Sequence, residues 1–297
     1  MGAFFIYPKN KPITLDSVKS VFEDKNLSNC REFDLGNHTL LLYGKVLLPE
    51  PLFFSLGNHF ICNVGTLVYK NKIEKEALTQ FLQDFIEGSV SSNDIHGTFC
   101  IIVHAKGQLY VINDDENLYP VYVHETSSCI SSSFLALCQL SDSLSINRLS
   151  LLENLITGCS LGFDTYFNEI KRFRWGNNVF LPNDVLSCFF NKSIQPSVER
   201  NVQSIILQQK EGFRSVFKRI SPLVNKYACE IGLSSGYDSR LLFASALHFF
   251  NKDFVYVSSN YKQKPDTDLK IARKLAETAQ KKLTEIPVIS TELMSEE

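Results

Sequence analysis

The chain has 297 residues, which is long enough for two domains of ordinary size. It is 44% apolar and 21% charged, as in a globular protein, and its formal net charge of -2 gives no electrostatic reason to expect nucleic acid or an acidic membrane as a partner. The sequence contains no apolar run near the roughly 18 residues that a membrane span needs, and its start lacks the basic segment of a signal peptide, so we expect a cytoplasmic protein.

The first 190 residues contain many short strand-like runs and a few helical patterns. Ala105-Lys106-Gly107 is expected to form a hairpin turn. Apolar spacing predicts helices over 73–87, stopped by Gly88, and over 148–156, ending at Gly158. This pattern predicts a layered α+β domain rich in antiparallel sheet. The predicted strands are 3–7, 38–43, 60–62, 66–69, 99–104, 108–113 and 121–124.

The polar, proline-bearing stretch 191–200 predicts a linker. A long helical pattern starts at Val202, and Ser221-Pro222 is expected to cap and restart it. Strands and helices then alternate, which is typical of a parallel sheet with right-handed crossovers. Three parallel strands are few for such a domain, so we expect 201–297 to be only its first portion. The predicted elements are strand 228–233, helix 239–250, strand 254–258, helix 268–283 and strand 284–289.

Eight cysteines are spread along the chain, and no two of them form a C-x-x-C pair. Most lie in apolar runs, so we interpret them as free, buried thiols. Zinc binding would require close pairs with further Cys or His nearby. The six histidines are equally scattered and are interpreted as structural or surface residues. The cysteines are Cys30, Cys62, Cys100, Cys129, Cys138, Cys159, Cys188 and Cys229.

Small polar residues fill the segment between the first parallel strand and its helix, L-S-S-G-Y-D-S over 233–239. In open α/β sheets, ligands bind beyond the carboxyl ends of the strands, where loops meet helix N-termini. Small residues let backbone N–H groups approach an anion, and Ser234, Ser235 and Ser239 add hydroxyl donors. Asp238 repels phosphate and is instead expected to bind a Mg²⁺ ion held between it and the phosphates. The alternative is a Ser/Gly turn that merely links strand and helix.

Residues 232–240 resemble the S-G-G-x-D-S loop of the ATP pyrophosphatase superfamily, in the form found in asparagine synthetases. Members of this family bind ATP there, adenylate a carboxylate and release pyrophosphate. Ser235 departs from the pattern, because it replaces the first Gly and its Cβ disfavours positive φ. The resemblance implies a metal site at Asp238 and adenine contacts from the backbone of Leu233 and Val257. The implied ATP-binding residues are Leu233, Ser234, Ser235, Gly236, Asp238, Ser239, Val257 and Ser258.

The flank of this loop also resembles the family, whose second strand precedes a D-x-x-x-A-x-x-x-A helix. Asp268, Ala272 and Ala276 have that spacing. An ordinary amphipathic helix gives the same stripe, so both interpretations stay open.

Motifs in the first half resemble, in the right order, the glutamine amidotransferase domain of the same enzymes, which is a sandwich of the N-terminal-nucleophile type. Residues 95–99 match L-x-G-x-F, and Asp114 with 120–122 matches R-D-x-x-G-x-x-P-L-Y, with Asn113 and Asn117 at the Arg and Gly positions. Residues 132–137 resemble S-E-x-x-A-L, and 165–170 resemble the strand that closes the domain.

The nucleophile of that domain is missing. An active member has a Cys after the initiator Met, and its own α-amine acts as general base. This chain has Gly2 there, and Val64-Gly65-Thr66 lacks the amide and the carboxylate of the glutamine-binding loop. We therefore expect 1–190 to be a sandwich of the N-terminal-nucleophile type without glutaminase activity, followed by an α/β parallel-sheet domain of the ATP pyrophosphatase type.

The resemblance implies an ATP-dependent ligase of the kind used in asparagine biosynthesis, with ATP and Mg²⁺ as cofactors. Aspartate or a related acid would be adenylated, and ammonia or an amine would displace AMP. Free ammonia, a substrate amine or a partner protein would supply the nitrogen, and the assembly is compatible with a homodimer.

Two alternatives stay open. The first is a non-catalytic relative or inactive fragment that serves as a binding or scaffold protein; Ser235 and the end at Glu297 favour it. The second is thiolation or tRNA modification, which the missing catalytic Cys pair and the absence of basic patches disfavour.

Overall fold

The computed structural model describes residues 2–45, 50–114, 117–173, 185–187, 201–260 and 267–287. The chain divides into two compact units, Met1–Gln195 and Pro196–Glu297. The predicted linker 191–200 lies outside the described residues, as do Cys188 and the last part of the strand predicted over 284–289. Among the described helices, none combines the length and the apolar character that a bilayer crossing requires.

One sheet of the first unit is antiparallel throughout. Its strands run in the order β11 (Ile170–Arg172), β9 (Tyr122–His124), β10 (Cys129–Ser131), β1 (Ala3–Pro8), β3 (His38–Tyr43) and β2 (Cys30–Leu35). Strand β1 is apolar on both faces, with Phe4 and Ile6 on one side and Phe5 and Tyr7 on the other. Because side chains alternate along a strand, β1 can pack against a layer on each side.

The other sheet of the first unit is antiparallel except at one edge. Its strands run in the order β12 (Val185–Ser187), β8 (Gln108–Asn113), β7 (Ile95–Ala105), β5 (His59–Tyr69) and β4 (Phe53–Leu56), and β6 (Lys72–Ile73) pairs with β5. The exception is β12, which runs parallel to β8.

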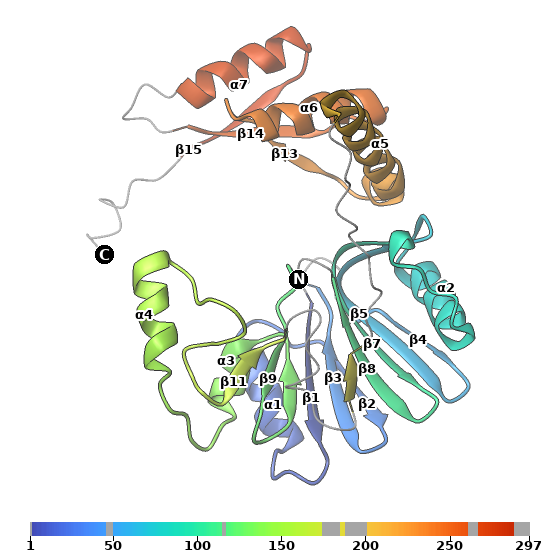
Figure 1. Cartoon of the computed structure of the whole chain (residues 1–297), viewed down its shortest axis with the longest axis vertical. Helices are drawn as coiled ribbons and strands as arrows, with labels where there is room; N and C mark the ends of the chain where they lie inside the picture. Colours follow the sequence, from blue (N-terminus) through green and yellow to red (C-terminus); the bar gives the residue numbers. More distant parts are fainter. Residues whose placement is uncertain are drawn as a thin grey trace. The chain divides into compact units, whose positions relative to one another are not determined.

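The two sheets pack face to face, and helices cover both outer faces. Phe4 of the first sheet and Cys62 of the second belong to the same apolar core. Helix α2 (Glu74–Glu87) packs on the outer face of the second sheet, and α1 (Leu15–Glu23) and α3 (Phe134–Gln139) pack on the outer face of the first (Figure 1). The first unit therefore has four layers, in the order helices, sheet, sheet, helix.

Two glycines permit the close pairing of β5 with β7. Gly65 has φ +84° and Gly97 has φ +119°, a region that other residues rarely adopt. A Cβ on Gly97 would lie 2.0 Å from the Thr66 carbonyl oxygen, and a Cβ on Gly65 would lie 2.3 Å from the Thr98 carbonyl oxygen. Gly97 in the 95–99 motif is thus required by the packing of the backbone.

The predicted turn after β7 is confirmed, because Lys106 and Gly107 connect β7 to β8 and both have positive φ. The separate strands predicted at 60–62 and 66–69 are wrong, because both belong to β5, which pairs with β7 along its length. The residues between them stay in the sheet, where Val64 is buried in the central core.

Both helices predicted in the first unit are confirmed. Helix α2 ends at Gly88 and α4 (Arg148–Thr157) ends at Gly158, and each glycine has the left-handed conformation that closes a helix. Three shorter helices, α1, η1 (Ser92–Asp94) and α3, were not predicted. Helix α1 buries only Val18 and Phe22, a single pair at helical spacing, which is too short a pattern to stand out in the sequence.

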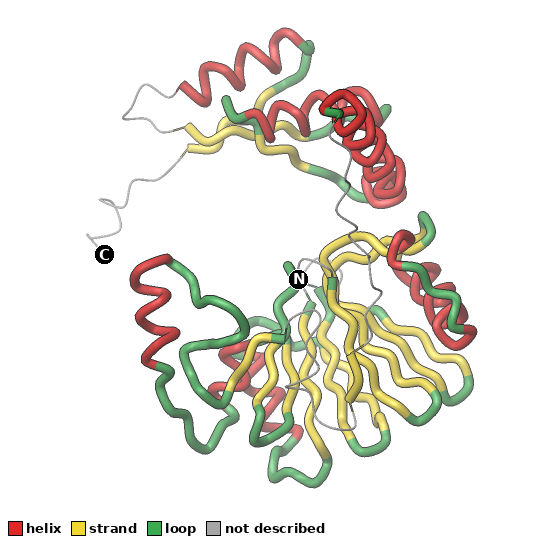
Figure 2. Tube along the Cα trace, in the orientation of Figure 1, coloured by secondary structure: helices red, strands yellow, loops and turns green. Residues whose placement is uncertain are grey.

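The second unit contains a three-stranded parallel sheet, and a helix connects each strand to the next along the chain (Figure 2). Its core includes Ala272 and Ala276, so the predicted alanine stripe packs against the sheet. The chain as a whole is thus a mixed α and β protein with antiparallel sheets in one unit and a parallel sheet in the other. In chain order the elements are α5 (Val202–Lys226), β13 (Glu230–Gly232), α6 (Tyr237–Phe249), β14 (Val255–Asn260), α7 (Thr267–Thr278) and β15 (Leu283–Pro287).

The predicted restart at Ser221-Pro222 is wrong, because α5 continues through Pro222. Proline removes one helical hydrogen bond, but buried contacts on both sides of it hold the helix together. Phe217 stacks on Phe249 of α6 with ring centroids 5.3 Å apart, and Val224 is buried further along. The Lys252 ammonium donates to the Val224 carbonyl oxygen at 2.6 Å, which stabilises the last turn.

The cysteines of the described residues are all free thiols. Cys62, Cys100 and Cys129 are buried, as expected, and burial raises the pKa of each. Cys159 is exposed, which the sequence did not predict. The remaining described cysteines are half-buried.

Candidate functional site

The predicted phosphate loop lies at the carboxyl end of β13. The Leu233 side chain is buried, and its backbone N–H donates to the Val257 carbonyl oxygen at 2.8 Å, which extends the pairing of β13 with β14 by one residue. The chain then leaves the sheet and enters α6 at Tyr237. Residues 234–239, called the serine loop below, therefore occupy the place where open α/β sheets bind ligands.

Two serines close this loop on itself. The hydroxyl oxygens of Ser234 and Ser239 share a hydrogen bond of 2.9 Å, and the Ser239 oxygen also accepts from the Ser234 backbone N–H at 3.2 Å. The Ser234 oxygen accepts from the Gly236 N–H at 3.2 Å. These two hydroxyls, predicted as phosphate donors, shape the loop in this structure.

The start of α6 presents unpaired backbone donors. Its N-cap, Gly236, has no side chain to accept a hydrogen bond. Within the described residues, the N–H groups of Tyr237, Asp238 and Ser239 donate no hydrogen bond, as expected of a first helical turn without a capping side chain. These three donors and the helix dipole make this turn attractive to an anion.

Ser235 does not strain the loop. A residue with a Cβ at the first glycine position would be unfavourable if that position had positive φ. Ser235 is not among the residues with positive φ, and Gly236 has φ -64°. The replacement of glycine by serine is therefore compatible with the backbone of the loop.

Asp238 lies in the first turn of α6 with its side chain exposed. Within the described part of the chain, no hydrogen bond or ion pair engages its carboxylate, and no group of three His, Cys, Asp or Glu side chains gathers as a metal site. Asp238 thus has the exposure that a ligand to a metal ion bound with phosphates requires.

Arg240 was not assigned a role from the sequence. Its guanidinium carbon lies 4.3 Å from the centre of the Tyr237 ring, and its Nε donates to the Gly236 carbonyl oxygen at 3.4 Å. A positive charge therefore lies beside the serine loop. The sequence could have indicated this role, because Arg240 follows the loop directly, within the first turn of α6.

Strand β14 brings the other predicted residues to the same edge. Val257 pairs with Gly232, and Ser258 is buried opposite Glu285 of β15. The Leu233 N–H and the Val257 carbonyl oxygen bond to each other, so adenine would have to use other backbone groups of these two residues.

The sequence did not predict a contact of Asp268 with the serine loop. The Ser235 backbone N–H donates to the Asp268 Oδ1 at 3.2 Å, and the Ser235 hydroxyl donates to the same oxygen. Asp268 lies in the first turn of α7, 33 residues further along the chain. One loop amide that is expected to bind phosphate thus binds a carboxylate of the same chain.

A second polar cluster joins the carboxyl end of β14, the middle of β15 and α7. Arg273 of α7 contacts both carboxylate oxygens of Glu285, each at 2.7 Å, and Asn260 donates to Glu285 at 2.9 Å. The hydrogen bond from Arg273 lowers the pKa of Glu285. These contacts connect α7 to the sheet. The sequence did not predict them, because the three residues lie in separate elements.

Position 2, where the resemblance leads us to expect a nucleophilic Cys, is closed. Gly2 is buried, and a Cβ there would lie 2.7 Å from the Tyr43 carbonyl oxygen. The Tyr119 hydroxyl donates to the Gly2 carbonyl oxygen at 2.6 Å. A thiol side chain at position 2 would require the backbone to shift.

The Asp114 motif holds a loop. The buried Asp114 carboxylate accepts from the backbone N–H groups of Phe99 at 3.3 Å, Leu118 at 2.8 Å and Tyr119 at 2.9 Å. Asn117 has φ +51°, which asparagine tolerates better than most residues, at the position where the amidotransferase motif has Gly. The Asp114 motif therefore fixes the backbone around residues 117–119.

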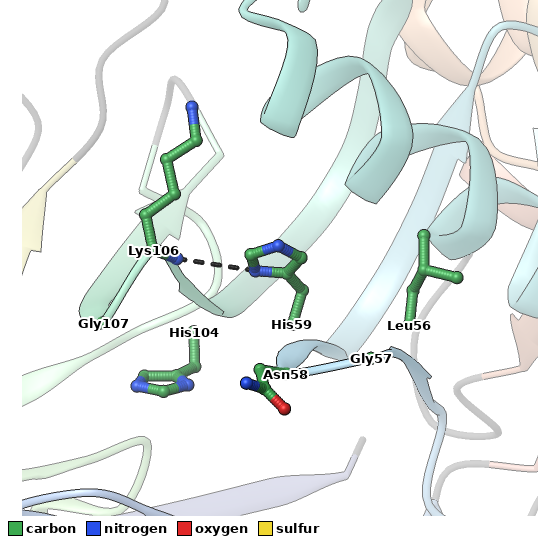
Figure 3. Close-up of a pocket in the computed structure, with 7 residues that line it drawn as sticks. All are labelled: Leu56, Gly57, Asn58, His59, His104, Lys106 and Gly107. Atoms are coloured by element: carbon green, nitrogen blue, oxygen red, sulfur yellow. Dashed lines mark hydrogen bonds between the residues drawn. The ribbon is translucent and has the colours of Figure 1, made fainter.

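A concave surface in the first unit lies between two hairpin turns of the second sheet (Figure 3). Asn58 lines it from the turn after β4 and His59 from the start of β5, and His104 lines it from the end of β7 and Lys106 from the turn that follows. The Lys106 backbone N–H donates to His59 Nδ1 at 3.4 Å. Burial lowers the pKa of His104, and the neighbouring His59 lowers it further. These contacts link the two turns, in keeping with the structural role expected of the histidines.

No protein-family model matches the chain, and no curated protein does so either.

Proposed function

We propose that the second unit binds the triphosphate of Mg-ATP at the serine loop, as part of an asparagine-synthetase-like ligase. The observation that carries this proposal is the uncapped start of α6, whose three unpaired N–H groups lie beside the carboxylate of Asp238. The loop follows a parallel strand, β13, and the buried Leu233 at its end, which is where such sheets bind nucleotides.

In this reaction a carboxylate of aspartate or a related acid attacks the α-phosphorus of ATP, and pyrophosphate leaves. Ammonia or an amine then attacks the resulting acyl group, the amide forms and AMP leaves with the bonding electron pair. Mg²⁺ would neutralise part of the triphosphate charge. The chain's own contribution is to orient the phosphates with the amides of 237–239 and to hold the metal with Asp238.

The first unit has the layer order expected of a sandwich of the N-terminal-nucleophile type, and we propose that it is a glutamine amidotransferase-like domain without glutaminase activity. Gly2 offers no nucleophile, and its surroundings leave no room for one. The nitrogen would therefore come from free ammonia, a substrate amine or a partner.

A thermal-shift titration with Mg-ATP tests the nucleotide proposal. At a ligand concentration of 100 times Kd, binding stabilises the folded protein by about 2.7 kcal/mol. Asp238→Asn is expected to lose the metal-dependent part of this gain. Asp253→Asn is the matched control, because Asp253 is an exposed aspartate that precedes β14 at the opposite end of the sheet. No shift for the wild-type protein would exclude this site.

A non-catalytic relative is the second candidate, and the contact of Asp268 with Ser235 favours it, because a carboxylate there competes with phosphate. Release of inorganic pyrophosphate in the presence of ATP, aspartate and ammonium separates the two candidates. Binding of Mg-ATP without pyrophosphate release for aspartate and related acids would favour the binding protein.

A further inference from the structure

We propose that Ser235 and Asp268 form a latch that competes with the triphosphate and sets how tightly the serine loop binds Mg-ATP. This inference rests on the proposed nucleotide site. It assigns a role to the one residue at which the loop departs from the S-G-G-x-D-S pattern.

The latch uses donors of the kind that phosphate needs. One oxygen of the Asp268 carboxylate accepts two hydrogen bonds from Ser235, one from the backbone N–H at 3.2 Å and one from the hydroxyl. A phosphate oxygen bound at this amide would have to take the place of that carboxylate oxygen. Two negatively charged groups cannot share one N–H donor without strong repulsion.

The hydroxyl of Ser235 is the part of the latch that glycine would lack. The backbone of the loop does not require glycine at this position, since φ of Ser235 is not positive. Serine therefore leaves the loop conformation intact and adds a second hydrogen bond to Asp268. A hydrogen bond to a charged acceptor is stronger than one to a neutral acceptor. Exposure of Asp268 to water reduces the net stabilisation that this bond gives.

Removing either half of the latch is expected to tighten nucleotide binding. Asp268→Asn removes the competing charge, and Ser235→Ala removes the hydroxyl while keeping the Cβ. We expect each to lower the Kd for Mg-ATP about fivefold, which corresponds to about 1 kcal/mol. The double variant should gain little beyond Asp268→Asn alone, because the hydroxyl bond that Ser235→Ala removes is made to the same carboxylate.

Isothermal titration calorimetry with Mg-ATP on the full chain measures these affinities, and far-UV circular dichroism checks that each variant is folded. Asp253→Asn, which removes one exposed carboxylate from the same unit away from the loop, should leave Kd within twofold. In the absence of nucleotide, amide exchange at Ser235 should be faster in Asp268→Asn, because that N–H has lost its charged acceptor.

The outcomes separate the latch from the nucleotide site. If the wild-type protein binds Mg-ATP and both variants bind it equally or more weakly, the latch is refuted and the nucleotide site stands. If neither the wild-type protein nor any variant binds, the nucleotide site is refuted and the latch with it.

Discussion

A substitution at Asp84 tests whether a buried carboxylate holds α2 to the second sheet. Its side chain is 8% exposed and accepts from the Tyr69 hydroxyl at 2.7 Å, the Lys70 ammonium at 2.8 Å and the Gln80 amide at 3.1 Å. Asp84→Asn keeps the shape of the side chain and removes its charge. Tyr69 at the end of β5 and Lys70 in the turn that follows then face a weaker acceptor.

The expected loss of stability is about 2 kcal/mol. Hydrogen bonds to a buried charged group contribute about 1.5–3 kcal/mol, and the variant retains a neutral acceptor for Tyr69. Lys70 is 38% exposed, so water stabilises its charge when the carboxylate is gone. The cost should therefore stay below the 3–5 kcal/mol typical of breaking a fully buried ion pair.

The effect of Asp84 should also depend on pH. Burial raises its pKa, but the hydrogen bonds from Lys70, Tyr69 and Gln80 outweigh this and lower the pKa below its ordinary value. The stabilisation is then complete above the unfolded pKa of about 3.9 and is lost as pH falls through the folded value. The stability difference between wild type and Asp84→Asn should narrow as pH falls below about 4.

Urea unfolding followed by circular dichroism measures both effects. Asp34→Asn is the control, because the Asp34–Lys9 pair is exposed and its loss should change stability little. If Asp84→Asn is as stable as Asp34→Asn at neutral pH, the buried network does not hold α2 to the sheet.

Two further substitutions test the first unit. Gly97→Ala should destabilise it by about 3 kcal/mol or more in urea unfolding, because the new Cβ would meet the Thr66 carbonyl oxygen. Gly212→Ala is the control and should be neutral or stabilising, because Gly212 lies in α5 with open space around it. Equal changes in the free energy of unfolding for the two variants would contradict this prediction. Gly2→Cys should lower the stability of the protein and should show no glutaminase activity in a glutamate-release assay, because a Cβ there would lie 2.7 Å from the Tyr43 carbonyl oxygen. Glutamate release above background would show that the position can hold a reactive thiol.

Local patterns predicted much of the fold. Gly88 and Gly158 end helices as expected, and the turn at Lys106 and Gly107 has the positive φ that its sequence indicates. Patterns interrupted by polar residues were less informative. Strand β5 was divided in two because Asn63 and Gly65 interrupt its apolar run, although pairing with β7 keeps both in the sheet.

The sequence also placed the serine loop between a strand and a helix, but not its contacts. Ser234 and Ser239 bond to each other, and Asp268 reaches Ser235 from another element. Such pairs depend on how α6 and α7 pack on the sheet, which periodicity does not determine. Pro222 is a similar case, because the contacts of Phe217 and Val224 override a local helix breaker.

The central claim is that the serine loop holds the phosphates of Mg-ATP, and amide chemical shifts measured during a Mg-ATP titration test it most directly. We predict that the signals of Tyr237, Asp238 and Ser239 move in a saturable way and that Asp238→Asn weakens the metal-dependent part of the change. Unchanged signals at these three amides up to millimolar Mg-ATP, or saturable changes confined to other residues, would contradict the account.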